Sequence, residues 1–157
     1  SGVGAALAKT ELAETLKEQG RSEKALELLK DALGIYLAEL SEEEQAGSTD
    51  LANTYSSMGG ICCSQGKHEP ALEHFEKCLA IQIKVLGEDH PSVAATCSNV
   101  GLVYGSQGKY EMALEQYEKC LAIEIKASGE DHPSVATTYS NIADVYDSQS
   151  KYEMALE

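Results

Sequence analysis

The sequence has 157 residues, of which 43% are hydrophobic, and its 12 Lys and Arg against 26 Asp and Glu give a formal net charge of −14. This length and apolar content are enough for a folded domain with a core. The negative charge argues against a nucleic-acid partner, whose phosphates need Lys and Arg, and against an anionic membrane surface.

Apolar residues recur at three- and four-residue spacing along the chain, which is the pattern of amphipathic helices and not of strands. In chain order, the stripes predict helices over about 3–19, 22–40, 48–65, 68–86, 91–107, 110–128 and 133–149, and an eighth that begins at about 152. The polar stretch 41–48 is predicted to be a loop. The fold class is therefore all-α, and no apolar run approaches the roughly 20 residues that span a bilayer.

The chain repeats itself with a period of 42 residues. Residues 67–108 match residues 109–150 at 28 of 42 positions, and Lys109–Glu115 is identical to Lys151–Glu157. A period of this length indicates stacked units. We predict one array over 1–157, with repeat 1 at about 3–40, the loop 41–48, repeat 2 at about 49–87, repeat 3 at about 91–129 and a truncated repeat 4 at about 133–157. Because the chain starts without Met and ends abruptly, we interpret it as an excised fragment.

Each repeat is predicted to be two helices joined by a short turn. Gly20, Gly66 and Gly108 lie at these turns, where a helix C-terminus in the left-handed conformation favours glycine. Pro91 and Pro133 fit the first turn of the following helix, where no N–H is needed. The neighbouring His90 and His132 recur with the linker and are interpreted as turn residues beside a helix cap.

The repeats resemble the tetratricopeptide repeat, and their length and Glu-Asp-His-Pro linkers are similar to those of kinesin light chains. The family's repeat begins with an apolar residue followed by a small one, then an aromatic residue one helical turn later and a glycine at the turn between the helices. The second helix then carries a small residue, an aromatic residue and another small residue. In repeat 3 they are Val100, Gly101, Tyr104, Gly108, Ala113, Tyr117 and Cys120. Repeat 2 has Met58, Gly59, Cys62, Gly66, Ala71, Phe75 and Cys78.

The resemblance implies a right-handed α-solenoid of antiparallel helix hairpins that binds proteins or peptides on its concave face. In the family, the first helix of each hairpin lines this face. By register, the predicted inner-face residues are Glu11, Glu14, Asn53, Ser56, Ser57, Ser98, Asn99, Leu102, Ser140, Asn141, Asp144 and Asp147. In peptide-binding members an Asn at the register of Asn99 and Asn141 holds the ligand backbone; the alternative is that both are ordinary surface residues.

The predicted inner face is small and polar at its centre and acidic at both ends. Lys17 is its one inward cation, whereas family members that bind acidic peptides use inward Lys and Arg. An acidic peptide would therefore meet like charge. The sequence predicts an interaction module, an adaptor or scaffold, for a neutral or basic extended peptide or a partner helix.

The competing interpretation is a structural module that assembles with itself. Repeat 4 keeps only the first residues of its second helix, so Ile142, Tyr146 and Met154 are expected to lack cover. An exposed apolar end is an association site. We expect a homo-oligomer through this end, a contact that further repeats would replace in a longer array.

We expect no enzyme, no cofactor and no metal site. The sequence has no phosphate loop, nucleophile elbow, HExxH or CxxC motif. Cysteines on the apolar stripes act as small hydrophobes, whereas Cys63 is expected to be exposed. Because the cysteines form no evident paired framework, we predict a reducing, cytoplasmic location.

Overall fold

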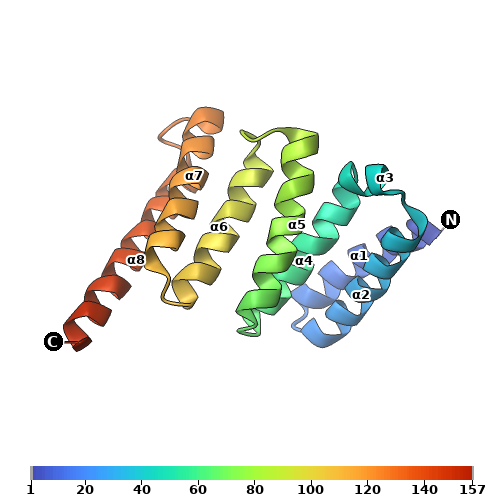
Figure 1. Cartoon of the computed structure of the whole chain (residues 1–157), viewed down its shortest axis with the longest axis horizontal. Coiled ribbons are helices and arrows are strands. Elements are labelled where there is room, and N and C mark those ends of the chain that lie inside the picture. The colour runs from blue at the N-terminus through green and yellow to red at the C-terminus, as the bar shows by residue number, and fades with distance from the viewer. Residues whose placement is uncertain (1, 157) are drawn as a thin grey trace. The chain divides into compact units, whose positions relative to one another are not determined.

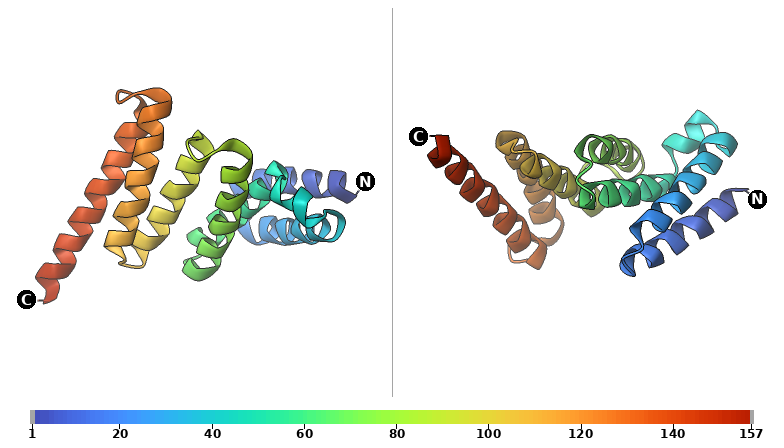
Figure 2. Two further views of the ribbon diagram at one scale, coloured as in Figure 1. Left: turned by 45° about the horizontal axis from the view of Figure 1, so that its top comes forward. Right: turned by 90° about the horizontal axis from the view of Figure 1, so that it is seen from below.

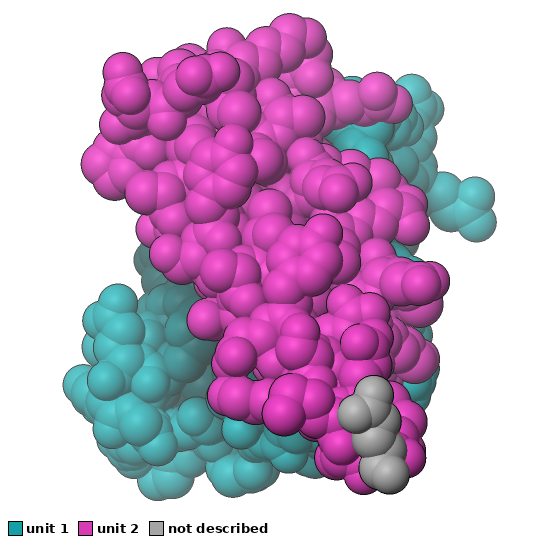
Figure 3. Space-filling model, turned by 90° about the vertical axis from the view of Figure 1, so that its left-hand side faces the viewer, with its two compact units in different colours: residues 1–85 teal, residues 86–157 magenta. Residues whose placement is uncertain are grey.

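The computed structural model describes residues 2–156, and every regular element in that range is an α-helix, as predicted. The helices are α1 (Gly2–Glu18), α2 (Ser22–Glu39), α3 (Glu42–Ala46), α4 (Thr49–Ser64), α5 (His68–Leu86), α6 (Pro91–Ser106), α7 (Tyr110–Ser128) and α8 (Pro133–Leu156), labelled in Figure 1. The chain divides into two compact units, residues 1–85 and 86–157, which Figure 3 colours separately.

Unit 1 contains two antiparallel helix hairpins, α1–α2 and α4–α5 (Figure 1, Figure 2). One cluster of buried side chains joins all four long helices, with Ala6 from α1, Tyr36 from α2, Leu51 from α4 and Ile81 from α5. A buried hydrogen bond of 3.1 Å between the Thr10 and Thr54 hydroxyls adds a polar contact between α1 and α4. Each hairpin thus buries its apolar face against the other, as expected of repeat units.

The predicted glycine turns are confirmed in backbone detail. Gly20, Gly66 and Gly108 have φ values of 74°, 70° and 72°, in the left-handed region. At each turn the N–H after the glycine donates to a carbonyl five residues earlier, as from Lys109 to Tyr104 at 2.9 Å. The glycine N–H donates to a carbonyl three residues earlier, and together these bonds form the Schellman motif that satisfies the helix end.

In repeats 2 and 3, the small residue of the apolar–small pair, Gly59 or Gly101, lies under the aromatic ring of the second helix. A Cβ added at Gly59 would lie 2.7 Å from the Phe75 ring, and one added at Gly101 would lie 3.0 Å from the Tyr117 ring. These distances explain why the pattern places glycine opposite a large aromatic side chain. The helices of a hairpin approach closely because one of them has no side chain at the contact.

The polar stretch between the first two hairpins contains a short helix, α3, where the sequence predicts only a loop. Ser41 caps this helix: its hydroxyl accepts from the Glu44 N–H at 3.3 Å, and the Glu44 carboxylate accepts from the Ser41 N–H at 2.8 Å. This reciprocal capping box stabilises a helix start. The Ser-x-x-Glu spacing that produces it is visible in the sequence, so the helix could have been predicted.

Unit 2 contains the hairpin α6–α7, and α8 packs on α7. Pro91 and Pro133 are the first residues of α6 and α8, as predicted. The residues before them cap these helices, since the His90 Nδ1 accepts from the Ser92 N–H at 3.1 Å and the His132 Nδ1 accepts from the Ser134 N–H at 3.2 Å. The two linker histidines are therefore structural residues.

The last helix corrects the predicted division of repeat 4. The sequence predicts a helix over 133–149 and a second one from about 152, but α8 continues without a break from Pro133 to Leu156. At the register of Gly66 and Gly108 this helix carries Ser150, which has a Cβ and avoids the left-handed conformation that the turn requires. The helix therefore continues through the position where the earlier repeats turn.

We expect Gly108→Ser, which copies residue 150 into the α6–α7 turn, to destabilise unit 2 by about 1–2 kcal/mol, the cost of a non-glycine residue in the left-handed conformation. Urea unfolding followed by circular dichroism measures the change. The control is Gly34→Ser in α2, where an added Cβ meets nothing within 4 Å and φ is not positive. A loss of stability in the control as large as in Gly108→Ser would contradict this explanation.

Candidate functional site

The predicted inner-face residues of unit 1 lie on α1 and α4, and two of them bind each other. The Ser57 hydroxyl donates to the Glu14 carboxylate, which also forms an ion pair with Lys17. Burial acts to raise the pKa of Glu14, but the hydrogen bonds from Lys17 and Ser57 outweigh it and hold the pKa below its usual value. Glu14 and Lys17 thus largely neutralise each other, so neither presents an unpaired charge to a ligand.

The other predicted residues of unit 1 do not gather into a pocket. Glu11 and Asn53 are exposed, and Ser56 is half-buried. They present separate polar groups along α1 and α4, which suits contact with a chain that runs over a surface.

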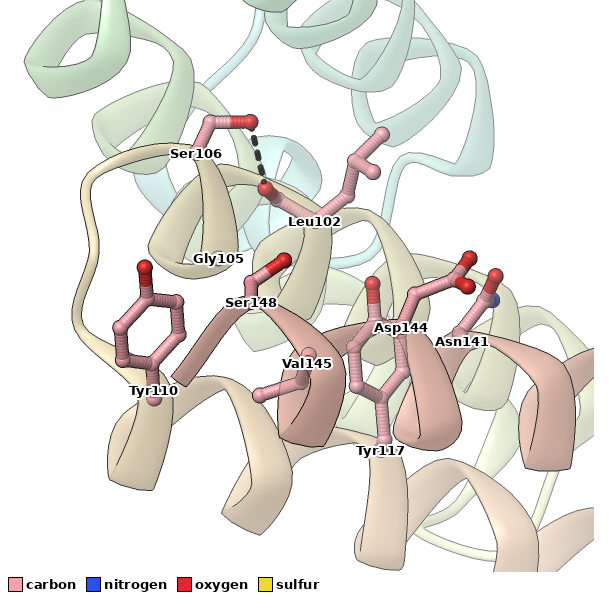
Figure 4. Close-up of a pocket in the computed structure, with 9 residues that line it drawn as sticks. All are labelled: Leu102, Gly105, Ser106, Tyr110, Tyr117, Asn141, Asp144, Val145 and Ser148. Carbon is pink, nitrogen blue, oxygen red and sulfur yellow. Dashed lines mark hydrogen bonds between the residues drawn. The ribbon is translucent and has the colours of Figure 1, made fainter. Parts of the chain in front are cut away.

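Unit 2 brings the predicted residues of two helices together around a pocket of about 290 Å³. Figure 4 shows Leu102, Gly105 and Ser106 from α6 on one side and Asn141, Asp144, Val145 and Ser148 from α8 on the other, with Tyr110 and Tyr117 from α7 completing the lining. Three of the predicted contact residues, Leu102, Asn141 and Asp144, therefore meet at one site.

The remaining predicted residues of unit 2 lie outside this pocket. Ser98 is half-buried and Asn99 is exposed on α6. On α8, the Ser140 hydroxyl donates to the Ala136 carbonyl at 3.1 Å, and Asp147 forms an ion pair of 2.7 Å with Lys151. The pocket thus contains Asn141 but not Asn99, although both occupy the same register of their repeats.

The contribution of α7 to the pocket is not apparent from the sequence. Tyr117, the aromatic mark of its repeat, is 2% exposed, yet the same ring lines the pocket. Tyr110, at the start of α7, lines it as well. No spacing signal identifies these residues, because their role arises from the packing of α8 on α7.

The face of α8 predicted to self-associate is partly covered. Ile142 is half-buried and packs against the cluster of Ala113, Tyr117 and Val145. Tyr146 and Met154 are 54% and 71% exposed. By contrast, Cys62, which holds the register of Tyr146 two repeats earlier, is buried.

The five cysteines form no disulfide: Cys62, Cys78, Cys97 and Cys120 are buried and Cys63 is half-buried. Burial raises the pKa of Cys62, Cys63 and Cys97, and raises that of Cys120 to about 11 despite a contact with the Thr138 hydroxyl. Thiols with a raised pKa carry little thiolate and react slowly. Cys63 is therefore less exposed than predicted, but it remains the most accessible of the five.

We expect a thiol reagent such as Ellman's reagent to label Cys63 first in the native protein at pH 8, more slowly than it labels free glutathione. The other four thiols should react only after unfolding, because burial excludes the reagent and suppresses ionisation. Reaction rates measured with and without denaturant test this, and Cys63→Ser is the control that should remove the first phase. A fast phase that survives in Cys63→Ser would contradict the assignment.

Over residues 2–156, no three His, Cys, Asp or Glu side chains are grouped so as to hold a metal ion. In the same range, none of the helices has the length and apolar character needed to cross a membrane.

Comparison with known proteins identifies the repeats. Family descriptions of the tetratricopeptide repeat match residues 50–126 and 98–157, and a second description of the same repeat matches residues 6–43. A search of curated protein sequences found no match.

Two solved structures have a similar fold. BtubC (BKLC) from P. vanneervenii is 24% identical with a TM-score of 0.81, over 92% of this chain and 56% of that one. Nearly identical repeats of a putative kinesin light chain from Podosopora anserina are 26% identical with a TM-score of 0.76, over 94% of this chain and 68% of that one. This chain thus spans little more than half the length of BtubC.

Proposed function

Because the chain belongs to the tetratricopeptide repeat family, whose repeats are generally protein–protein interaction modules, we propose that it is a non-catalytic adaptor or scaffold. Its ligand is an extended peptide or a partner helix, neutral or basic, and the inner-face residues of its units bind it. The observation that carries the proposal is the pocket of unit 2, where Asn141 and Asp144 face a lining without a cation. A cytoplasmic location stays a prediction.

The chemistry of the inner-face residues supports an extended ligand. Serine and asparagine side chains offer donors and acceptors to peptide groups, and an asparagine amide can pair with a peptide unit through both of its ends. Within residues 2–156 the side-chain amides of Asn99 and Asn141 form no hydrogen bond, so both are available to a ligand.

The charge of these residues supports the choice of ligand. Lys17 is paired with Glu14 inside unit 1, so the single inward cation of the sequence is already used. Glu11 and Asp144 have no ion pair in the described part of the chain. An acidic peptide would therefore meet unbalanced negative charge, whereas a basic one would be attracted to it.

The test compares matched synthetic peptides, with Lys or Glu alternating with Ser and Ala, for binding to the whole 157-residue chain at low salt. We expect tighter binding of the Lys series, and this preference should shrink as salt screens the charges. Tighter binding of the Glu series would overturn the choice of ligand. Failure of both series, and of a neutral Ser–Ala series, would overturn the proposed binding function.

Variants of the two asparagines test the binding surface. Asn99→Ala and Asn141→Ala should each weaken every peptide that binds, whatever its charge, by about five- to tenfold, the effect of losing about one hydrogen bond. Gln19→Ala, which removes an exposed side-chain amide outside the predicted inner face, is the matched control. Unchanged affinity in both test variants would show that the asparagines are ordinary surface residues.

A second function, self-assembly, is favoured by the exposed Tyr146 and Met154 of α8. Apolar side chains of this size gain free energy when a second copy covers them. Sedimentation over a concentration series should show a dimer that Tyr146→Glu with Met154→Glu abolishes. Met112→Glu, at an exposed methionine of α7, should leave it intact. A monomer at millimolar concentration would overturn this second function. The asparagine variants, which weaken peptide binding, should leave assembly unchanged.

A further inference from the structure

We propose that the pocket between α6, α7 and α8 is a subsite for one cationic side chain, Lys or Arg, of the bound peptide. This inference rests on the proposed function and makes it more specific, because it assigns one residue of the ligand to one place on the protein. The subsite is defined by the nine residues that line the pocket, drawn in Figure 4.

The size and walls of the pocket fit a long side chain. At about 290 Å³ it lies at the lower limit of small-molecule sites, which suits a single side chain better than a whole ligand. Leu102 and Val145 provide apolar wall, and the rings of Tyr110 and Tyr117 provide aromatic surface. Lys and Arg bury their methylene stems along such walls while the charged head stays near polar groups.

The charge of the pocket selects a cation. Asp144 is the one charged residue of the lining, and within residues 2–156 its carboxylate forms no ion pair or hydrogen bond. The two lysines nearest to it in the sequence are engaged elsewhere: Lys151 pairs with Asp147 at 2.7 Å, and Lys126 pairs with Asp89. Asp144 thus lacks a counterion that a basic ligand would supply.

The polar groups around the pocket favour a donor-rich ligand. The Ser106 hydroxyl donates its proton to the Leu102 carbonyl at 3.0 Å, shown by the dashed line in Figure 4, so it presents lone pairs to the pocket. The Asn141 amide oxygen and the Asp144 carboxylate add further acceptors. An ammonium or guanidinium group carries three to five N–H donors and no acceptor, which complements this arrangement.

The same register in the other repeats shows that the subsite is particular to unit 2. The positions equivalent to Asp144 are Leu102 and Gly60, which are uncharged, and Glu14, which is already bound to Lys17 and Ser57. An unpaired carboxylate at this register therefore occurs beside the pocket and not at the equivalent places in the other repeats.

The experiment titrates the isotope-labelled 157-residue chain with two peptides that differ at one position, Lys in one and norleucine in the other, in a Ser–Ala background. Backbone amide shifts of residues 102–106 and 141–148 report binding at the pocket. We expect the Lys peptide to bind about three- to tenfold more tightly, the effect of one charge-assisted contact at a partly exposed site. Replacing Lys by Arg should preserve the preference.

Two variants separate the pocket from general electrostatics. Asp144→Asn should abolish the preference for Lys over norleucine. Asp147→Asn removes the same charge from the same helix one turn away, but this residue is paired with Lys151 and does not line the pocket, so the preference should persist. Circular dichroism checks that both variants keep the helical fold.

Three results would overturn the subsite. Equal or tighter binding of the norleucine peptide would show that the pocket does not select a cationic side chain. If Asp144→Asn and Asp147→Asn reduced the preference for Lys equally, the preference would arise from the net charge of the protein and not from the pocket. Binding without shifts of the pocket amides would place the ligand elsewhere. In each of these cases the peptides still bind, so the proposed function stands. If neither peptide bound, both the subsite and the proposed function would be overturned.

Discussion

Phe75→Ala is expected to destabilise unit 1 by about 3–5 kcal/mol, the usual cost of deleting a fully buried aromatic side chain. Phe75 is 1% exposed and lies over Gly59 of α4, where an added Cβ would come within 2.7 Å of the ring. The cavity left by the ring cannot be filled from the α4 side, because Gly59 has no side chain to move into it. Much of the contact between the two helices is therefore lost.

Denaturant unfolding of the whole chain, followed by circular dichroism at 222 nm, measures this effect. The matched control is Ile83→Ala, two turns further along α5, where the side chain is 40% exposed and the expected loss is below about 1 kcal/mol. Equal losses in the two variants would show that the ring is not the main contact of this hairpin.

The overpacking that Gly59→Ala introduces is expected to destabilise the protein by about 1–3 kcal/mol, as is typical of an added side chain at a close contact. Its Cβ would lie 2.7 Å from a Phe75 ring that is itself enclosed, so either the ring or the helices must shift. This loss opposes the gain of about 1 kcal/mol that alanine usually brings over glycine inside a helix. The net change is therefore expected to be a destabilisation of up to about 2 kcal/mol.

The neighbouring Gly60 is a control within the same helix. A Cβ at Gly60 meets nothing within 4 Å, so Gly60→Ala should stabilise α4 by about 0.5–1 kcal/mol through helix propensity alone. The two adjacent variants should thus change stability in opposite directions. A stabilised Gly59→Ala would mean that the ring can move aside, and that glycine is not required at this contact.

Much of the fold could be predicted because local chemistry determines it. The glycine turns are set by the conformational freedom of Gly20, Gly66 and Gly108, and the helix starts by Pro91 and Pro133. The i,i+4 ion pairs of Glu73 with Lys77 and Glu115 with Lys119 form at 3.0 and 3.3 Å, and depend only on spacing along one helix.

The end of the chain shows the limit of such reasoning. Lys109–Leu114 and Lys151–Leu156 have the same six residues, yet the first begins a new helix and the second continues α8. Repetition alone predicts the same structure twice. The difference arises at the preceding residue, Gly108 or Ser150, and from packing: Ala113 is buried in unit 2, whereas Ala155 is exposed.

The helical repeat, its turns and the register of the candidate contact residues follow from the amino-acid sequence, because each depends on neighbours within a few residues. Which of the candidate contact residues lie next to each other depends on the packing of the helices. Glu14 forms an ion pair with a lysine on its own helix and accepts a hydrogen bond from a serine on α4, whereas Asp144 lies unpaired beside a pocket lined by tyrosines of α7. The physical reason is that a carboxylate's partners are set by distances between helices, and a pattern of spacings along the chain does not contain those distances.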